Sequence, residues 1–409
     1  MLVFEAKLEG TKQQYERLDE AIRTARFVRN SCLRYWMDNK GIGKYELSAY
    51  CAVLAKQFPW AGRLNSQARQ ASAERAWSAI ARFYDNVRLS AHVEACKKGK
   101  PGKKGFPRFK KHQTHGSVEY KATGWKLSED RRTITFSDGF EAGSFKLWGT
   151  RDLHFYQLKQ IKRVRVVRRA DGYYAQFCLD VERVEKREPT GKTIGLDVGL
   201  THFYTDSHGK TLENPRHLRK SEKVLKRLSK RLSRTPKGSK NRAKAQIRLS
   251  RKHLKVSRQR KDFAVKKALC VIQSNDLVAY EDLQVRNMVK NGRLAKSISD
   301  AAWSAFRQWL EYFGKVFGVV TVAVPPHYTS ANCSNCGETV KKSLSQRTHQ
   351  CPHCGFILDR DWNAAINILE LALRTVGHTG TNASGDIDLC LGEVTPPSKP
   401  SRGKRKPKK

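Results

Sequence analysis

Residues 193–212 read TIGLDVGLTHFYTDSHGKTL, and this stretch decides the fold of the second half of the chain. An apolar segment leads up to Asp197, a turn follows at Gly199, and the segment 207–209 is typical of a hairpin. The pattern predicts three consecutive antiparallel strands, the first of them buried. We therefore expect an α/β domain in which the carboxylate of Asp197 lies at the end of a core strand.

A second acid ends another apolar segment, NDLVAYEDL at 275–283. Its length and composition predict a short buried strand that ends at Glu281. Side chains alternate across a strand, so Glu281 shares a face with Leu277 and Ala279, whereas Asp282 points the other way. The next segment, SISDAAWSAFRQWLEYFGKVFG at 297–318, predicts one helix that Ser299 or Asp300 could cap.

A third acid, Asp361, begins the apolar helix pattern DWNAAINILELAL at 361–373. If the two acidic strands are neighbours in one mixed sheet and this helix packs on it, three carboxylates converge at one sheet edge. Such like charges destabilise one another unless cations are present. With two Mg²⁺ ions roughly 4 Å apart, the cluster is a two-metal phosphodiester cleavage site. Each acid also has a structural interpretation, as a turn former, a strand end or a helix cap, and spacing alone leaves both interpretations open.

Four of the ten cysteines form two C-x-x-C pairs, CSNC at 333–336 and CPHC at 351–354. Each pair places two thiolates on a tight turn, and 14 residues separate the pairs. Cys333, Cys336, Cys351 and Cys354 together predict a tetrahedral all-cysteine zinc site. A closed shell of this kind has no open position for water, so this zinc is expected to be structural. The scattered cysteines are interpreted as reduced thiols: Cys32, Cys51, Cys96, Cys178, Cys270 and Cys390.

The charge of the chain predicts a polyanionic partner. It carries 80 Lys and Arg against 38 Asp and Glu, a formal net charge of +42 that is spread along the whole sequence. Self-repulsion at this charge destabilises a compact protein unless counter-charges bind, so nucleic acid is the expected partner. No stretch of about 18 apolar residues and no secretory h-region occur, which predicts an intracellular protein that does not bind membranes.

The first half of the chain predicts a small β-barrel with a helical insertion near its start. Residues 2–7 alternate like a strand, and helical periodicity covers much of 18–87. The basic segment KKGKPGKKGFPRFKK at 97–111 breaks this pattern, and short β-branched or aromatic segments follow from 117 to 184.

Two further segments are strongly basic. Residues 216–267 contain 22 Lys and Arg but only Glu222 and Asp262 as acids. The leucine spacing on both sides of TPKGSK predicts a helical hairpin that binds along a phosphate backbone. From about residue 377 the composition turns to Gly, Ser, Thr, Asn and Pro, which is typical of a disordered tail.

GLDVGL, AYEDL and DRDWNAAINI resemble the three parts of a RuvC-type, RNase H-like nuclease. Their order, with KSISDAAW between the second and third parts and a CxxC…CxxC ribbon before the third, is similar to the TnpB family of insertion-sequence-encoded, RNA-guided DNA endonucleases. ARFVRNSCLRYW, GFPRFKK, RQRKDFAVKKA and PPHYTSANCSNCG also resemble family segments, so the resemblance covers roughly residues 1–372.

The resemblance implies that Asp197, Glu281 and Asp361 are the catalytic acids and hold two Mg²⁺ ions, and that the four grouped cysteines bind one Zn²⁺. It also implies the domain organisation. This comprises a wedge-like β-barrel at 1–25 and 101–186, a helical recognition lobe at 26–100, a RuvC-like nuclease domain at 187–325 and 357–376, a zinc ribbon that binds target nucleic acid at 326–356, and a disordered basic tail at 377–409.

The implied partners are a guide RNA made from the transposon end and a double-stranded DNA target beside a short motif. The protein would be a monomer on one RNA, in a prokaryotic cytoplasm and nucleoid-associated when bound to DNA. Base pairing supplies the sequence specificity, and the protein holds the backbone. The nominated motif readers are Tyr45 and Gln67. The nominated backbone contacts are Lys103, Lys104, Arg108, Lys110, Lys226, Arg227, Arg231, Arg251, Lys252 and Arg258.

Three alternatives stay open at this point. A compact type V CRISPR effector shares the RuvC core and the ribbon. A conventional DNA-strand transposase of the RNase H-like class normally has its glutamate last among the acids. A zinc-ribbon regulator or RNA chaperone would bind nucleic acid without using the three acids.

Because lysine and arginine contacts to phosphate release counterions, we predict that nucleic-acid binding falls steeply as salt rises. Filter binding across a salt series measures this slope. A flat response between low and moderate salt contradicts the electrostatic interpretation.

Overall fold

The computed structural model describes residues 2–95, 105–111, 116–149, 152–343 and 346–377. The chain forms two compact units. The first comprises Met1–Arg183 and Ser221–Ser257, and the second comprises Val184–Lys220 and Arg258–Lys409. None of the helices within the described ranges has the length and apolar character that a membrane crossing requires.

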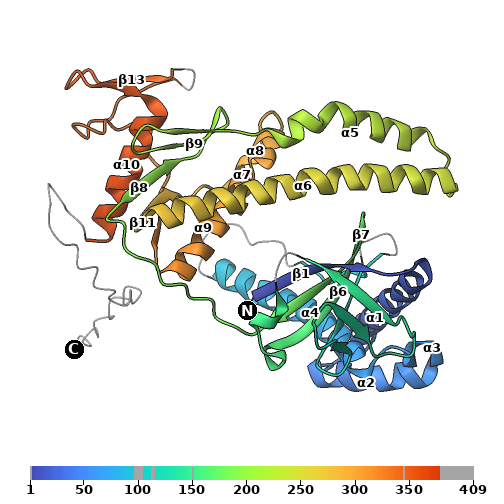
Figure 1. Ribbon diagram of the computed structural model, residues 1–409. Helices are drawn as coiled ribbons and strands as arrows, with labels where there is room; N and C mark the ends of the chain where they lie inside the picture. Colours follow the sequence, from blue (N-terminus) through green and yellow to red (C-terminus); the bar gives the residue numbers. More distant parts are fainter. Residues whose placement is uncertain (1, 96–104, 112–115, 150–151, 344–345, 378–409) are drawn as a thin grey trace, which may run out of the picture. The chain divides into compact units, whose positions relative to one another are not determined.

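The first unit is built on a seven-stranded antiparallel sheet in the order β2-β6-β7-β1-β5-β4-β3. Strands β1, β6 and β7 of this sheet are labelled in Figure 1. The strands are β1 (Leu2–Glu9), β2 (Ser117–Tyr120), β3 (Trp125–Leu127), β4 (Thr133–Phe136), β5 (Ser144–Trp148), β6 (Ile161–Arg169) and β7 (Gly172–Leu179). Between β5 and β6 lie two short 3₁₀ helices, Leu153–Phe155 and Leu158–Gln160.

This sheet curls back on itself. Its two edge strands, β2 and β3, are consecutive in the chain, and only residues 121–124 separate Tyr120 from Trp125. A connection of that length spans less than about 20 Å, so the edges approach each other at this end. The strand order has no β2–β3 pairing, however. The expected barrel is therefore only partly closed.

Within the residues that the structure describes between β1 and β2, four helices follow one another, as the predicted insertion requires. They are α1 (Lys12–Asp38), α2 (Lys44–Gln57), α3 (Pro59–Gly62) and α4 (Ser66–Ala95). Thr11 starts α1 with a capping box, in which its hydroxyl accepts from Gln14 N and the Gln14 side chain accepts from Thr11 N. Leu18 and Ile22 of α1 pack in the sheet core, and Val28 packs among the helices. The boundary predicted after residue 25 thus falls inside one continuous helix.

The second unit contains a five-stranded mixed sheet in the order β10-β9-β8-β11-β12. The strands are β8 (Thr193–Asp197), β9 (His202–Asp206), β10 (Thr211–Glu213), β11 (Leu277–Glu281) and β12 (Val320–Val324). β8, β9 and β10 form the predicted antiparallel run, and β11 pairs in parallel with β8 and β12. The two strands that carry Asp197 and Glu281 are therefore direct neighbours.

Helices cover both faces of this sheet. Ile194, Leu196 and Val278 face the core that is shared with α9 (Trp303–Phe317) and the last turns of α6 (Lys240–Ser274). On the other face, Leu277 and Ala279 pack against α10 (Arg360–Thr375), which lies along β8 and β11 in Figure 1. The other elements of the chain include α7 (Val285–Met288), α8 (Ala295–Ala301), β13 (Thr348–Gln350) and β14 (Ile357–Asp359).

The predicted single helix over 297–318 is wrong. Ala302 adopts a left-handed conformation with φ 59°, which ends α8 and starts α9. Neither predicted cap residue caps this helix. The Asp300 carboxylate instead accepts hydrogen bonds from Leu218 N at 2.8 Å and from Arg219 N at 3.3 Å, so it caps the start of α5 (His217–Arg234).

The predicted basic hairpin is confirmed. α5 and α6 are joined by a turn at 235–239, where Arg242 donates to the carbonyl oxygens of Leu232 at 2.9 Å and Thr235 at 2.6 Å. These contacts satisfy carbonyl groups at the end of α5 that have no partner inside the helix.

Gly195 provides a stability test. A Cβ atom at this position would lie 2.2 Å from the backbone oxygen of Ala365 and 2.9 Å from Leu369 Cβ, because α10 crosses β8 here. We predict that Gly195→Ala lowers the free energy of unfolding by about 1–3 kcal/mol through overpacking, measured in urea. Gly292→Ala is the matched control, since nothing lies within 4 Å of its added Cβ. Equal stabilities of the two variants would contradict the described packing.

Candidate functional site

The three acids come from the last residues of two neighbouring strands and the first turn of a helix. Asp197 ends β8 and Glu281 ends β11, and the register places Leu196 opposite Tyr280. By alternation, Asp197 lies on the same face as Gly195, which is the face that α10 covers. Glu281 likewise shares the face of Leu277 and Ala279. The topology therefore brings Asp197, Glu281 and Asp361 to one side of one sheet.

The pKa of Asp197 is affected by burial and by the two neighbouring acids. Burial raises the pKa of its carboxyl well above the usual value, and repulsion from Glu281 and Asp361 raises it further, against a smaller opposing effect of Arg360. Burial also raises the pKa of Glu281, although a hydrogen bond from Thr329 Oγ1 at 2.5 Å opposes this. Negative charge is thus disfavoured at both strand ends unless a cation is close.

Two arginines neutralise the third acid. Asp361 Oδ1 accepts from Arg360 Nη2 at 3.0 Å, and Asp361 Oδ2 accepts from Arg347 Nη1 at 3.3 Å. Arg347 also donates to Thr201 Oγ1 at 3.3 Å. Thr329, Arg347 and Arg360 were not predicted from the sequence. Of these, only Arg360 had a local signal, because it stands beside Asp361 in DRDW.

The chemistry of the three carboxylates suits a hard divalent cation such as Mg²⁺, which prefers oxygen ligands. A cation would relieve the repulsion that raises the pKa of Asp197. The sulfur atoms of the four grouped cysteines all lie within 4.8 Å of one another. Among the described residues, the carboxylate oxygens of the three acids are not this close together. Since two arginines hold Asp361, metal binding by all three acids requires that these ion pairs loosen.

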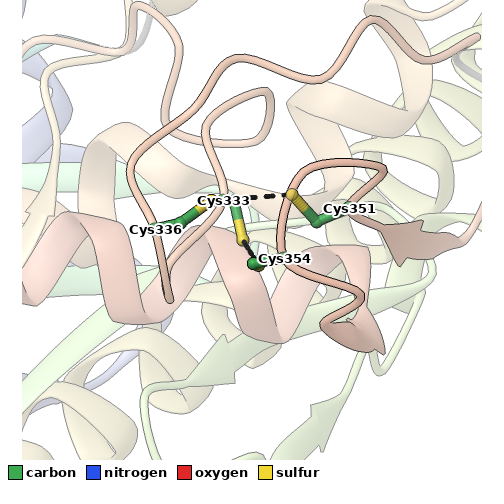
Figure 2. A group of neighbouring side chains, drawn as sticks. All are labelled: Cys333, Cys336, Cys351 and Cys354. Carbon is green, nitrogen blue, oxygen red and sulfur yellow. Dashed lines mark hydrogen bonds between the residues drawn. The ribbon is translucent and has the colours of Figure 1, made fainter.

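The four grouped cysteines converge as predicted (Figure 2). Their sulfur atoms all lie within 4.8 Å of one another, with Cys333 3.7 Å from Cys354 and Cys336 3.6 Å from Cys351. A hydrogen bond from Asn335 Nδ2 lowers the pKa of the Cys354 thiol to about 6, which favours the thiolate that binds metal. This group could bind one zinc ion.

α10 contacts the loop that carries the first cysteine pair, CSNC at 333–336. Asn363 Oδ1 accepts from Ser334 N at 3.0 Å, and Asn363 Nδ2 donates to Asn332 O at 2.8 Å. One turn later, Asn367 Nδ2 donates to Thr329 O and Asn332 O, both at 2.8 Å. Both asparagines are buried. The cysteine ribbon is therefore fixed to the helix that carries Asp361, and Thr329 connects it to Glu281.

The nominated nucleic-acid contacts lie in varied settings. Tyr45 is 82% exposed in the first turn of α2, whereas Gln67 accepts a hydrogen bond from Thr123 N at 3.3 Å. Lys226 pairs with Glu222 at 3.1 Å, and Arg251 donates to Ala170 O at 3.1 Å. Lys226 and Arg251 are exposed, as are Arg108, Lys110, Arg227, Arg231 and Arg258, whereas Lys252 is half-buried. Lys103 and Lys104 lie outside the described residues.

Two family models match the chain. The OrfB_IS605 family, described as "Probable transposase", matches residues 176–292, which contain Asp197 and Glu281. The Cas12f1-like TNB domain matches residues 303–368, which contain the four grouped cysteines and Asp361.

Curated relatives extend the match. A Streptomyces pristinaespiralis protein, provisionally named an RNA-guided DNA endonuclease, is 37% identical over 212 residues, 51% of this chain and 52% of the relative. An Acanthamoeba polyphaga mimivirus protein named TnpB-like protein L770 is 26% identical over 273 residues, 61% of this chain and 51% of the relative. InsQ of Escherichia coli K12, which has the same provisional name as the Streptomyces protein, is 30% identical over 311 residues and 72% of each chain. The chain belongs to the TnpB family.

A solved structure has the same fold as this TnpB-family chain. A Cas12f1 protein, determined by cryo-EM in complex with its guide RNA and target DNA, superposes with a TM-score of 0.51 over 88% of this chain and 83% of that chain. The two sequences are only 16% identical, so this likeness concerns the fold alone.

The cysteine group gives a direct prediction. We expect Cys354→Ser to reduce the zinc content of the purified protein from one ion per chain to near zero and to lower its melting temperature, because a structural zinc site contributes folding free energy. Elemental analysis and thermal unfolding measure both effects. Cys270→Ser is the control, since Cys270 is an exposed free cysteine. Full zinc content in Cys354→Ser would contradict the predicted ligand set.

Proposed function

We propose that this TnpB-family protein is an RNA-guided DNA endonuclease of a transposon. It cleaves double-stranded DNA next to a short motif, with Asp197, Glu281 and Asp361 as the catalytic acids. The observation that carries the proposal is the convergence of these carboxylates, from two parallel strands and one helix, on one face of the second unit's sheet. The names of the relatives and the two family models support it.

The fold supports a finer assignment of the second unit. Three antiparallel strands continued by two parallel ones, with helices on both faces, are what an RNase H-like domain of the RuvC type requires. We assign 187–325 and 357–376 to this nuclease domain, and 326–356 to a zinc ribbon that binds target nucleic acid. The partly closed barrel and the helices inserted in it would form the wedge-like domain and the recognition lobe.

Bound Mg²⁺ would supply an activated water and a counter-charge for the leaving 3′ oxygen. The residues of the chain provide the frame for this chemistry. Asp197 and Glu281 are fixed by the β8–β11 register, and Thr329 orients the Glu281 carboxyl. Asp361 is held by Arg360 and Arg347, which keep this acid in place before metal binds.

The partners follow from the same assignment. A guide RNA would select the target by base pairing, and the +42 chain would hold the phosphate backbones of RNA and DNA. We assign one protein chain to one RNA.

Alanine at each of the three acids tests the proposal. Loss of an outer-shell group at a metal site costs about 10–100-fold, so loss of a ligand should reduce cleavage by more than about a hundredfold. Guide RNA binding and thermal stability should be kept. Cleavage of a labelled target beside its motif measures the effect.

Asp282→Ala is the matched control for Glu281→Ala. Asp282 is the next residue, points to the opposite face and pairs with Arg307, so its loss should leave cleavage nearly unchanged. Normal cleavage by any one of the three alanine variants removes that residue from the site. If all three cut normally, the regulator interpretation is favoured, and if the protein joins transposon ends without RNA, the transposase interpretation is favoured.

A further inference from the structure

The segment GFPRFKK at 105–111 is held along helix α1. The side-chain amide of Asn30 donates to Lys110 O and accepts from Lys110 N, both at 3.0 Å. Arg29 Nη1 donates to Arg108 O at 3.3 Å. Seven residues further along α1, on the same helix face as Arg29, the Trp36 ring lies 5.9 Å from that of Phe106. Hydrogen bonds to the backbone of Arg108 and Lys110, together with the ring contact of Phe106, therefore hold this segment along α1.

The fixed segment brings together cations from several elements of the first unit. Partial burial and repulsion from Arg75, Arg29 and Arg165 lower the pKa of Lys110 to about 8. Arg29 comes from α1, Arg75 from α4 and Arg165 from β6. Arg29 is only 7% exposed, although it is a charged residue. Gathering these groups costs electrostatic free energy that an anion would offset.

The nearby carboxylates are largely committed to other cations. Glu119 binds Arg163 at 2.9 Å and Arg165 at 2.7 Å, and Glu74 binds Lys121 at 2.7 Å. Glu119 also attracts Arg75 electrostatically, without an ion pair. Within the described part of the chain, no carboxylate forms an ion pair with Arg29, Arg75 or Lys110. The cluster thus keeps a surplus of positive charge.

The same segment carries two exposed aromatic rings. Phe106 is 55% exposed and Phe109 is 44% exposed, both in the same seven-residue segment. Phe106 also contacts Phe83 of α4, with ring centroids 5.2 Å apart, so its orientation is fixed. Cations that follow a backbone, with exposed rings on which bases stack, are the features of sites for single-stranded nucleic acid.

We propose that Arg29, Arg75 and Lys110, with the rings of Phe106 and Phe109, form a binding site for the phosphodiester backbone and stacked bases of a single-stranded nucleic-acid segment. The proposal rests on the proposed function insofar as that supplies RNA and DNA as partners. The site lies in the first unit and does not involve the catalytic acids.

Lysine acetylation footprinting tests this site in the folded full chain. Asp197→Ala protein, purified free of nucleic acid, is treated with an acetylating reagent alone or with a 15-nucleotide oligouridine or oligothymidine. Lys110 should react faster than Lys126, an exposed lysine on β3, and should be protected at least about tenfold by a bound strand. Protection by oligouridine alone assigns the site to RNA, protection by oligothymidine alone assigns it to DNA, and protection by both assigns it to either backbone.

Two outcomes of the footprinting experiment would contradict the proposed site. If neither oligonucleotide protects Lys110 more than Lys126, the site is overturned, whatever the cleavage assays show. If a 15-base-pair duplex protects Lys110 as well as a single strand does, the stacking role of Phe106 and Phe109 is wrong. An independent measurement is the slope of log affinity for a single strand against log salt concentration. Lys110→Gln should reduce the magnitude of this slope by about 0.7, whereas Lys126→Gln should change it much less.

Discussion

The burial of neighbouring carboxylates on one face of the sheet is the constraint on which the second unit depends. Hydrogen bonding between β8 and β11 fixes two of the acids side by side on one face of the sheet, and α10 packs the third onto that face. A protein that only needed stability would gain by replacing any one of them. In this arrangement the pKa of the Asp197 carboxyl is raised well above its usual value. Strongly shifted pKa values of this kind are typical of functional sites.

The cysteine ribbon and the acidic site are parts of one framework. Asn363 and Asn367 of α10 form hydrogen bonds with the loop 329–334, which leads into the first cysteine pair. Thr329 of this loop donates a hydrogen bond to Glu281. A change in the ribbon can therefore be transmitted to two of the three acids through hydrogen bonds between buried groups. These hydrogen bonds explain in physical terms why the cysteine ribbon directly precedes α10, the helix that carries Asp361, in the sequence.

Sequence patterns predicted those features that depend on periodicity and spacing. Alternation along NDLVAYEDL placed Glu281 on the face of Leu277, and the two C-x-x-C pairs identified the sulfur cluster. The break at Ala302 was missed, because alanine in a left-handed conformation has no signature in sequence and only tertiary packing selects it. Arg347 was missed for a similar reason. Its contact with Asp361 joins the loop before β13 to the first turn of α10, and a single arginine among many gives no signal.

The proposed nuclease requires that Asp197, Glu281 and Asp361 share divalent metal. The most direct test is a crystal structure of the protein bound to its guide RNA and soaked in Mn²⁺, in which anomalous scattering locates the ions. We predict anomalous peaks in contact with all three carboxylates, with the Arg347 and Arg360 ion pairs to Asp361 released. Peaks that contact only one of the acids, or no peak at this sheet edge while Asp361 stays paired with both arginines, would contradict it.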